Sequence, residues 1–184
     1  LAAASVGQVY LATEKESGQD VIIKVMRPNI RERATREIAL LKRLAPSTGT
    51  RKIVDRLEES LFEELDFRLE AKNMVDGQVY WKPQKGIFPI YAADMFETTR
   101  DVLVMERAYE DPIDKFHTKD LPLKSEALGT FLETWYDEAL FGSGFFHADL
   151  HAGNIFFNPT PLPDYAPYGR DYQITLIDFG SCGR

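Results

Sequence analysis

One ordered set of acidic and amide residues constrains this chain more than any other feature. Residues 147–154 read His-Ala-Asp-Leu-His-Ala-Gly-Asn, and an Asp-Phe-Gly follows at 178–180. Each motif adjoins a short apolar run that is typical of a strand, which places the polar side chains at strand ends. A positioned Asp can accept a proton, and Asn and Asp oxygens are ligands that Mg²⁺ prefers. The spacing therefore predicts phosphoryl transfer, with Asp149 orienting the nucleophile and Asn154 and Asp178 holding the metal.

A zinc site is the alternative interpretation of the same segment. His147, Asp149 and His151 alternate as chelating side chains can. The other histidine, His117, stands in a polar stretch, and we expect it to be solvated. The single cysteine, Cys182, excludes an internal disulfide and a metal cage made of cysteines alone. Zinc is therefore the weaker hypothesis.

The beginning of the chain predicts a narrow loop followed by a hairpin. Residues 2–9 read Ala-Ala-Ala-Ser-Val-Gly-Gln-Val and match a glycine-rich phosphate loop in which only the third glycine is kept. Residues 8–13 and 21–26 then have the pattern of two antiparallel strands. Lys24 shares a strand face with apolar Ile22 and Met26, so we expect it to have an anionic partner. Nucleotide phosphates and a helix glutamate would satisfy it.

Two helices are expected between the strand at 21–26 and the strand at 87–92. A helix is predicted over 28–44, and apolar residues at every fourth position from 53 to 69 predict one continuous helix over 53–80. Glu64 points away from the helix face that carries the other acidic side chains. The candidates on that face for the partner of the lysine are Glu63, Asp66 and Glu70.

The remainder of the chain predicts a boundary between a sheet-rich and a helix-rich part near 106–112. Strands at 87–92 and 102–105 are expected to complete the first sheet, and a helix at 125–140 with strands at 155–157 and 174–177 to build the second part. The end of the strand at Met105 and Glu106, with Ala108 beyond it, is where an adenine ring could bind backbone groups. Four prolines between 158 and 173 predict an extended surface loop.

Taken together, these motifs resemble the UbiB/aarF/ADCK family of atypical kinases from end to end. The segments that carry the resemblance are 2–9, 21–28, 64–73, 102–106, 144–154 and 177–180. The resemblance implies an α+β, protein-kinase-like fold of two lobes. The N-lobe at 1–108 would have a small antiparallel sheet with helices, and the partial C-lobe at 109–184 would be mainly helical. Because both ends cut through working motifs, we expect a piece of a longer protein, with any targeting peptide or membrane anchor outside it.

The resemblance also implies a role for each motif residue. Lys24 would be the nucleotide lysine, paired with Glu70, and Asp149 the catalytic aspartate. Glu64 and Asp66 match the family's Glu-x-Asp motif, which faces a Lys-x-Gly-Gln extension that this sequence lacks. The implied metal ligands are Asn154 and Asp178. The implied nucleotide-binding residues are Ala2, Ala3, Ala4, Ser5, Gly7, Val9, Lys24, Met105, Glu106 and Ala108.

ATP and Mg²⁺ are the cofactors that the resemblance implies, with ATPase-type activity that supports ubiquinone or other isoprenoid-lipid metabolism. Protein kinase activity is not expected, because the extension would block a protein substrate and the alanine loop disfavours γ-phosphate transfer. Lipid, a membrane or quinone-pathway proteins would be met through regions outside this chain. The implied locations are the mitochondrion, the plastid or the bacterial cytoplasmic membrane face.

Two other functions stay open at this stage. A small-molecule phosphotransferase of the aminoglycoside or choline kinase type has a similar catalytic loop, although the alanine-rich loop and the Glu-x-Asp helix differ from it. A pseudokinase scaffold would bind nucleotide and a partner without turnover. The formal net charge of −7 argues against a nucleic-acid partner.

Overall fold

The structure, a computed structural model, describes residues 6–80, 87–89, 98–108, 111–115, 121–159 and 172–183. Several sequence predictions lie outside these residues. They concern Ala2, Ala3, Ala4, Ser5, His117 and most of the expected loop over 158–173.

An antiparallel sheet of three strands forms the first part of the molecule. The predicted hairpin is confirmed by β1 (Gly7–Thr13) and β2 (Asp20–Met26), which pair antiparallel. Beside β2 lies β4 (Val102–Glu106), so the strand order is β1-β2-β4. Lys24 therefore lies on the central strand, between Val9 and Leu103 of its neighbours.

A second sheet has the order β3-β8-β7-β5. Its central strands, β7 (Ile155–Asn158) and β8 (Gln173–Leu176), are antiparallel. On the outside lie β5 (Asp111–Pro112), antiparallel to β7, and β3 (Ile87–Pro89), parallel to β8. The prediction that the strand near 87–92 completes the first sheet is therefore wrong. A strand's partner is chosen by packing between distant segments, which a local pattern does not encode.

Two helices form where the sequence predicted a single one. In place of a single helix over 53–80, the chain forms α2 (Thr48–Glu64) and α3 (Phe67–Tyr80), with a break at Leu65 and Asp66. Arg31 donates two hydrogen bonds to the carbonyl oxygen of Leu65, at 3.0 and 2.6 Å. Contacts from outside the helix thus satisfy the backbone at the break, which the apolar spacing alone could not reveal.

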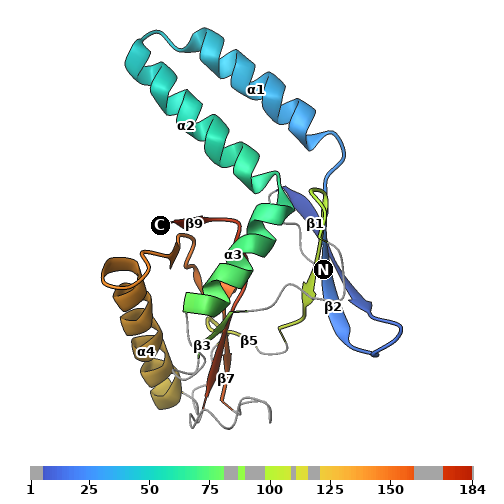
Figure 1. Cartoon of the computed structure of the whole chain (residues 1–184), viewed down its shortest axis with the longest axis vertical. Coiled ribbons are helices and arrows are strands. Elements are labelled where there is room, and N and C mark those ends of the chain that lie inside the picture. The colour runs from blue at the N-terminus through green and yellow to red at the C-terminus, as the bar shows by residue number, and fades with distance from the viewer. Residues whose placement is uncertain are drawn as a thin grey trace.

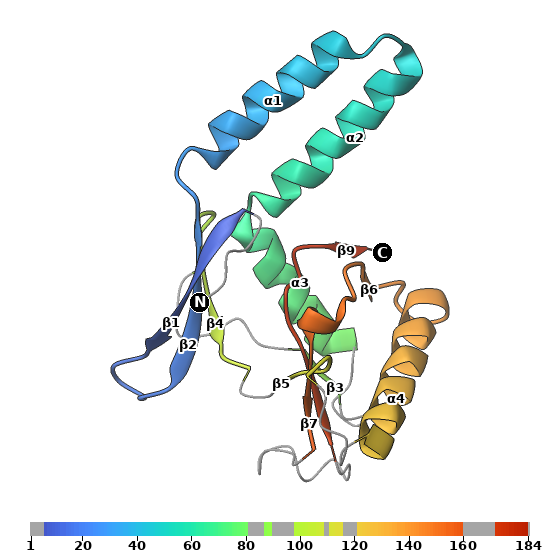
Figure 2. The same cartoon turned by 180° about the vertical axis from the view of Figure 1, so that it is seen from behind.

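The hairpin of α1 (Ile30–Leu44) and α2 stands away from both sheets (Figures 1 and 2). Its two helices pack through a small core of Ile38, Ala45 and Val54. The predicted apolar stripe of α2 is largely open, and Ile53 is 69% exposed. The four-residue spacing of apolar side chains here belongs to a helix whose apolar face is only partly covered by the neighbouring helix, not to a helix with a fully buried face.

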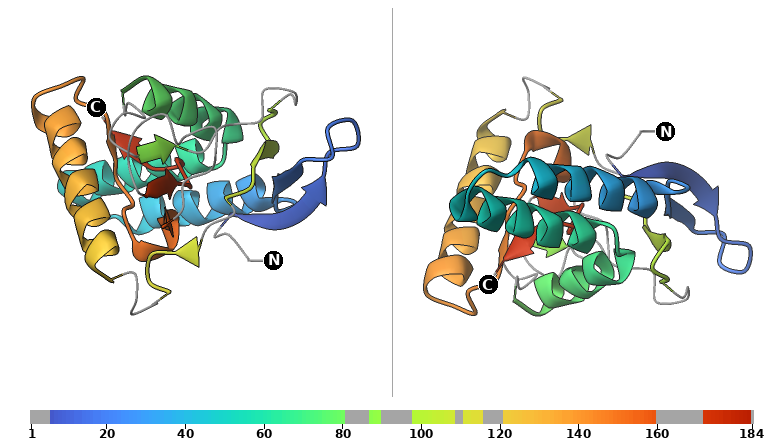
Figure 3. Two further views of the ribbon diagram at one scale, coloured as in Figure 1. Left: turned by 90° about the horizontal axis from the view of Figure 1, so that it is seen from below. Right: turned by 90° about the horizontal axis from the view of Figure 1, so that it is seen from above.

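The remaining helix, α4 (Leu121–Leu140), lies against the second sheet (Figure 3). Two short strands, β6 (Phe146–His147) and β9 (Cys182–Gly183), pair antiparallel and join the segments that carry the two sequence motifs. The main core includes residues of both sheets, α3 and α4. In the described part of the chain, no helix combines the length and the apolar content that crossing a membrane requires.

Candidate functional site

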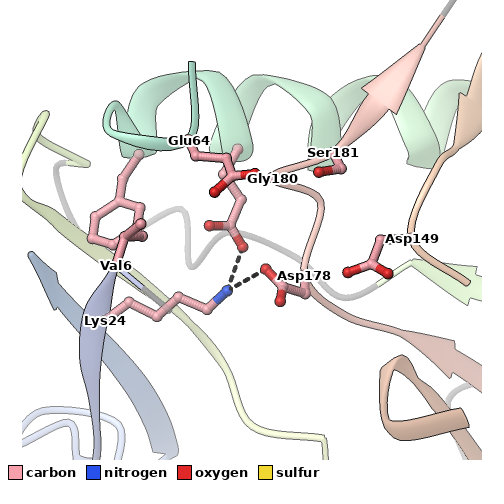
Figure 4. A pocket seen from close by; sticks show the side chains of 9 residues that line it. Val6, Lys24, Glu64, Asp149, Asp178, Gly180 and Ser181 are labelled. Carbon is pink, nitrogen blue, oxygen red and sulfur yellow. Dashed lines mark hydrogen bonds and ion pairs between the residues drawn. The ribbon is translucent and has the colours of Figure 1, made fainter. Parts of the chain in front are cut away.

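A cavity opens where β2, α3, the loop after β6 and the segment after β8 meet (Figure 4). Its side chains include one ammonium group and four carboxylates, a formal excess of three negative charges. The lining residues are Val6, Lys24, Glu64, Phe67, Glu70, Asp149, Asp178, Gly180 and Ser181. Such an excess of like charge in a shared cavity favours the binding of cations.

Lys24 joins two walls of this cavity. Its Nζ lies 2.5 Å from Oε1 of Glu70 on α3 and 3.0 Å from Oδ1 of Asp178, which follows β8 (Figure 4). Lys24 is only 7% exposed and Glu70 only 5%. Burial by itself lowers the pKa of Lys24, but the two carboxylates outweigh it and raise that pKa above its usual value. The ammonium is therefore charged, and the anionic partner that the strand pattern predicted is present.

Glu70 is held by the turn of α3 that faces β2. Burial raises the pKa of its carboxyl, and the adjacent Lys24 acts in the opposite direction. Removing the lysine would leave a buried carboxylate with no compensating charge.

The loop that carries Asp149 is fixed by hydrogen bonds to the segment beyond Asp178. Next to the β6–β9 pairing, the amide of Ala148 donates to the carbonyl oxygen of Ser181 at 2.9 Å. Nδ2 of Asn154, which is buried, donates to the carbonyl oxygen of Asp149 at 3.1 Å. The Asp149 side chain itself is 54% exposed at the mouth of the cavity. Asn154 thus holds the backbone of the loop at Asp149. The oxygen of its side-chain amide, Oδ1, could serve as a metal ligand.

His147 is a buried structural residue of this loop. Its Nε2 lies 3.1 Å from the carbonyl oxygen of Ile177, and its Nδ1 accepts a hydrogen bond from the amide of Asp149 at 3.2 Å. Burial lowers the pKa of the imidazole, although the hydrogen bond to Ile177 opposes that change. Both ring nitrogens are used, and the described residues contain no group of three or more His, Cys, Asp or Glu side chains able to hold a metal ion. The zinc interpretation is therefore wrong for this part of the chain.

Asp178 has a left-handed backbone, with φ of 63°. Non-glycine residues rarely adopt this region, and those that do are frequent at functional sites, where the surroundings hold them. Its carboxylate points into the cavity, and the side chain is 46% exposed. One carboxylate oxygen is bound to Lys24, and the exposed remainder faces the same space as Asp149.

The two acidic residues of the Glu-x-Asp motif have separate surroundings. Glu64 lines the cavity, contrary to the prediction that it points elsewhere, because the helix breaks directly after it. Burial raises the pKa of Glu64, and the nearby carboxylates Asp178 and Asp149 raise it further. Asp66 lies beside Arg68, whose hydrogen bond lowers the pKa of the Asp66 carboxyl. Asp66 is not a lining residue.

Of the expected nucleotide residues on the first sheet and just beyond it, Lys24 lines the cavity, whereas Gly7, Val9, Met105, Glu106 and Ala108 do not. Gly7 begins β1, where a Cβ would lie 3.0 Å from the carbonyl oxygen of Val25, and half-buried Val9 follows on the same strand. Met105 is buried in the main core, and Ala108 packs against it. Glu106 ends β4 and accepts a hydrogen bond from Gln19 at 3.4 Å. Their contact with a nucleotide stays a prediction.

Sequence reasoning assigned no role to several residues of the site. Nδ2 of Asn73 donates to the carbonyl oxygen of Phe179 at 2.9 Å, and four further residues line the cavity: Val6, Phe67, Gly180 and Ser181. Asn73 closes the acidic motif on α3, so its position in the sequence was visible, but only the fold shows what it contacts.

Comparison with known proteins places this chain in a family. Residues 1–184 match the model of the ABC1 atypical kinase-like domain. A protein of Erwinia tasmaniensis named "Probable protein kinase UbiB" is 34% identical over all of this chain and 34% of its own length. One of the same name from Xylella fastidiosa is 32% identical, again over 100% of this chain and 34% of its own length.

A solved structure has the same fold. The Mycobacterium tuberculosis protein described as "The complex structure of Rv3197-erythromycin" gives a TM-score of 0.73 at 26% identity, covering 100% of this chain and 45% of that one. This confirms the predicted α+β, kinase-like fold. The chain spans about a third of the length of the curated relatives it matches.

Proposed function

The chain belongs to the ABC1 atypical kinase-like family, and on that premise we propose that its cleft binds Mg²⁺ and ATP for phosphotransferase or ATPase chemistry. The observation that carries the proposal is the position of Lys24, which binds both Glu70 and Asp178 in a cavity that Asp149 also lines. One ammonium and an Asp pair facing a common space is the arrangement that phosphoryl transfer uses.

Each residue has a chemical task in this proposal. Lys24, held by Glu70, binds the phosphate oxygens, and Asp149 orients the attacking oxygen and accepts its proton. Asp178 and Asn154 supply the oxygen ligands for Mg²⁺, which neutralises charge on the phosphates when it is bound. The donors fit this ion, because Mg²⁺ keeps several water and phosphate ligands and needs only one or two from the protein.

The charge balance of the cavity supports a metal requirement. Four carboxylates against one ammonium leave an excess of negative charge, and a triphosphate adds more. Glu64 and Asp149 would repel a bare nucleotide, so its approach depends on a divalent cation that offsets both sets of charges.

The wider role follows from the relatives. Proteins named UbiB are similar to this chain over its whole length. We propose that the whole protein supports ubiquinone or other isoprenoid-lipid metabolism, at a mitochondrial, plastid or bacterial membrane. Partners of that kind would be met by parts of the protein outside this chain.

Hydrolysis by the intact protein tests the proposal. Asp178→Asn keeps the size of the side chain and removes the charge that binds the metal, so Mg²⁺-dependent ATP hydrolysis should be lost while the melting temperature changes little. Asp114→Asn, an exposed residue outside the cavity, is the matched control. Unchanged turnover in Asp178→Asn would remove Asp178 from the site.

A further inference from the structure

One face of α3 makes three contacts with the cleft, of which the proposed function uses one. Glu70, Asn73 and Gly77 are spaced three and four residues apart, so they lie on the same side of the helix. Glu70 binds Lys24, Asn73 binds the carbonyl oxygen of Phe179, and Gly77 lies against the Phe179 ring. The second and third contacts are made to the residue directly after Asp178.

Asp178 needs support because its backbone is strained. A non-glycine residue with φ of 63° persists when the surrounding structure holds it in place. On the N-terminal side of Asp178, both backbone groups of Ile177 are hydrogen-bonded. Its amide donates to the carbonyl oxygen of Asn154 at 3.1 Å, and its carbonyl oxygen contacts Nε2 of His147. On its C-terminal side, the Asn73 amide holds the carbonyl oxygen of Phe179 at 2.9 Å.

Packing of the Phe179 ring also holds the peptide that follows Asp178. It is fully buried and packs edge-on against His147, with the ring centroids 5.1 Å apart. A Cβ on Gly77 would lie 2.8 Å from the ring, so this contact requires glycine or a shift of the ring. The ring is thus held between α3 and the catalytic loop.

We propose that Asn73 is a positioning residue that keeps the Asp178 carboxylate directed into the cleft by anchoring the peptide that follows it. This inference rests on the proposed function, because the carboxylate being positioned is the proposed metal ligand. Loss of the Asn73 bond frees the carbonyl oxygen of Phe179 and lets the left-handed residue relax. Asp178 then spends less time in the orientation that binds Mg²⁺ and Lys24.

The test compares wild-type protein with Asn73→Ala, Asn73→Asp and the control Lys72→Ala. Asn73→Asp keeps the shape but presents carboxylate oxygens to a carbonyl oxygen, so it should disrupt at least as strongly as Asn73→Ala. Lys72 is the neighbouring exposed residue, paired with Asp76 on the same helix. Two quantities are measured in the intact protein. They are the Mg²⁺ concentration for half-maximal ATP hydrolysis and deuterium exchange of the peptide over 175–183.

We expect both Asn73 variants to need about tenfold more Mg²⁺, the effect of losing one partly buried hydrogen bond. The KM for ATP at saturating Mg²⁺ stays within about twofold, and the peptide over 175–183 exchanges faster, while Lys72→Ala matches the wild type. A lower melting temperature with unchanged Mg²⁺ dependence and unchanged exchange would overturn the proposal. If wild-type protein hydrolyses no ATP, the proposed function fails, and exchange alone decides the positioning role: faster exchange confined to the Asn73 variants supports it.

Discussion

The two ends of the cleft differ in the burial and the charge pairing of their side chains. At the lysine end, Lys24 and Glu70 are almost fully buried and bind each other directly. At the catalytic-loop end, the side chains of Asp149 and Asp178 are about half exposed, and both carry negative charge toward the same cavity. The lysine end pairs its buried charges internally, whereas the catalytic-loop end carries more negative charge than its one contact with Lys24 offsets.

This difference assigns separate roles to the two ends. A buried ion pair resists rearrangement because separating its partners strands a charge in the interior. Exposed carboxylates lose little when they exchange water for a cation. Under the proposed function, we expect the lysine end to contribute to both stability and nucleotide binding. We expect the catalytic-loop end to contribute to chemistry and metal binding, with little effect on the fold.

The largest expected effect concerns the catalytic-loop end. Asp149→Asn should lower the rate of ATP hydrolysis by about 10²- to 10⁴-fold, because a positioned proton acceptor is lost. The melting temperature should stay close to that of the wild type, since the side chain is half exposed. Single-turnover hydrolysis and a thermal melt check both statements. A variant that unfolds earlier yet still turns over would reverse the assignment.

The lysine end should show the opposite pattern. Lys24→Met leaves Glu70 buried without its partner, which we expect to cost about 3–5 kcal/mol of unfolding free energy. The double variant Lys24→Met with Glu70→Met should regain much of that stability and still fail to bind nucleotide. Urea unfolding and a nucleotide titration separate the two results. Equal stability of the single and double variants would mean that the pair is not coupled.

Acid should destabilise the fold through His147, which contacts Asp149 and Ile177 at the catalytic-loop end. Burial lowers the pKa of His147 in the folded state, so the unfolded chain binds the proton more readily. Above a pH of about 6.5, His147 is neutral in both states and does not affect the free energy of unfolding. Below that pH, its protonation in the unfolded chain lowers the free energy of unfolding by at most about 1.4 kcal/mol per pH unit. Melts between pH 7.5 and 5 should show a steeper decline for the wild type than for His147→Phe. Parallel slopes would count against this account.

The smallest expected effect is at Glu64. Burial and the neighbouring Asp178 and Asp149 raise its pKa, so the ionised form opposes folding once the pH exceeds the ordinary glutamate value. Glu64→Gln should raise the melting temperature by about 1–2 °C at pH 7.5, because water screens a partly exposed charge. At pH 4 the difference should vanish. A loss of stability at pH 7.5 would show that Glu64 is paired in the free protein.

Much of this arrangement could be read from local sequence. A lysine among apolar residues on a strand predicts a buried charge with an anionic partner, and Lys24 has two. The motifs around Asp149 and Asp178 predicted side chains at strand ends facing a common space, as the cavity shows. Such inferences succeed because burial of charge and strand alternation act over a few residues.

The features that sequence did not reveal depend on distant contacts. The break between α2 and α3 is stabilised by Arg31, more than thirty residues away, while the apolar spacing continues across it. Because of that break, the Glu64 side chain lines the cavity, whereas the spacing of a continuous helix predicts that it points elsewhere. The partner of β3 and the bond from Asn73 to Phe179 are likewise set by tertiary packing.

Calorimetric titration of the intact protein with ATP, in Mg²⁺ and in EDTA, tests the central claim most directly. If the buried ammonium at one end and the excess of carboxylates at the other form one nucleotide site, ATP should bind with Mg²⁺ and at least about tenfold more weakly without it. Equal affinity in EDTA, or no binding in Mg²⁺, would contradict the account.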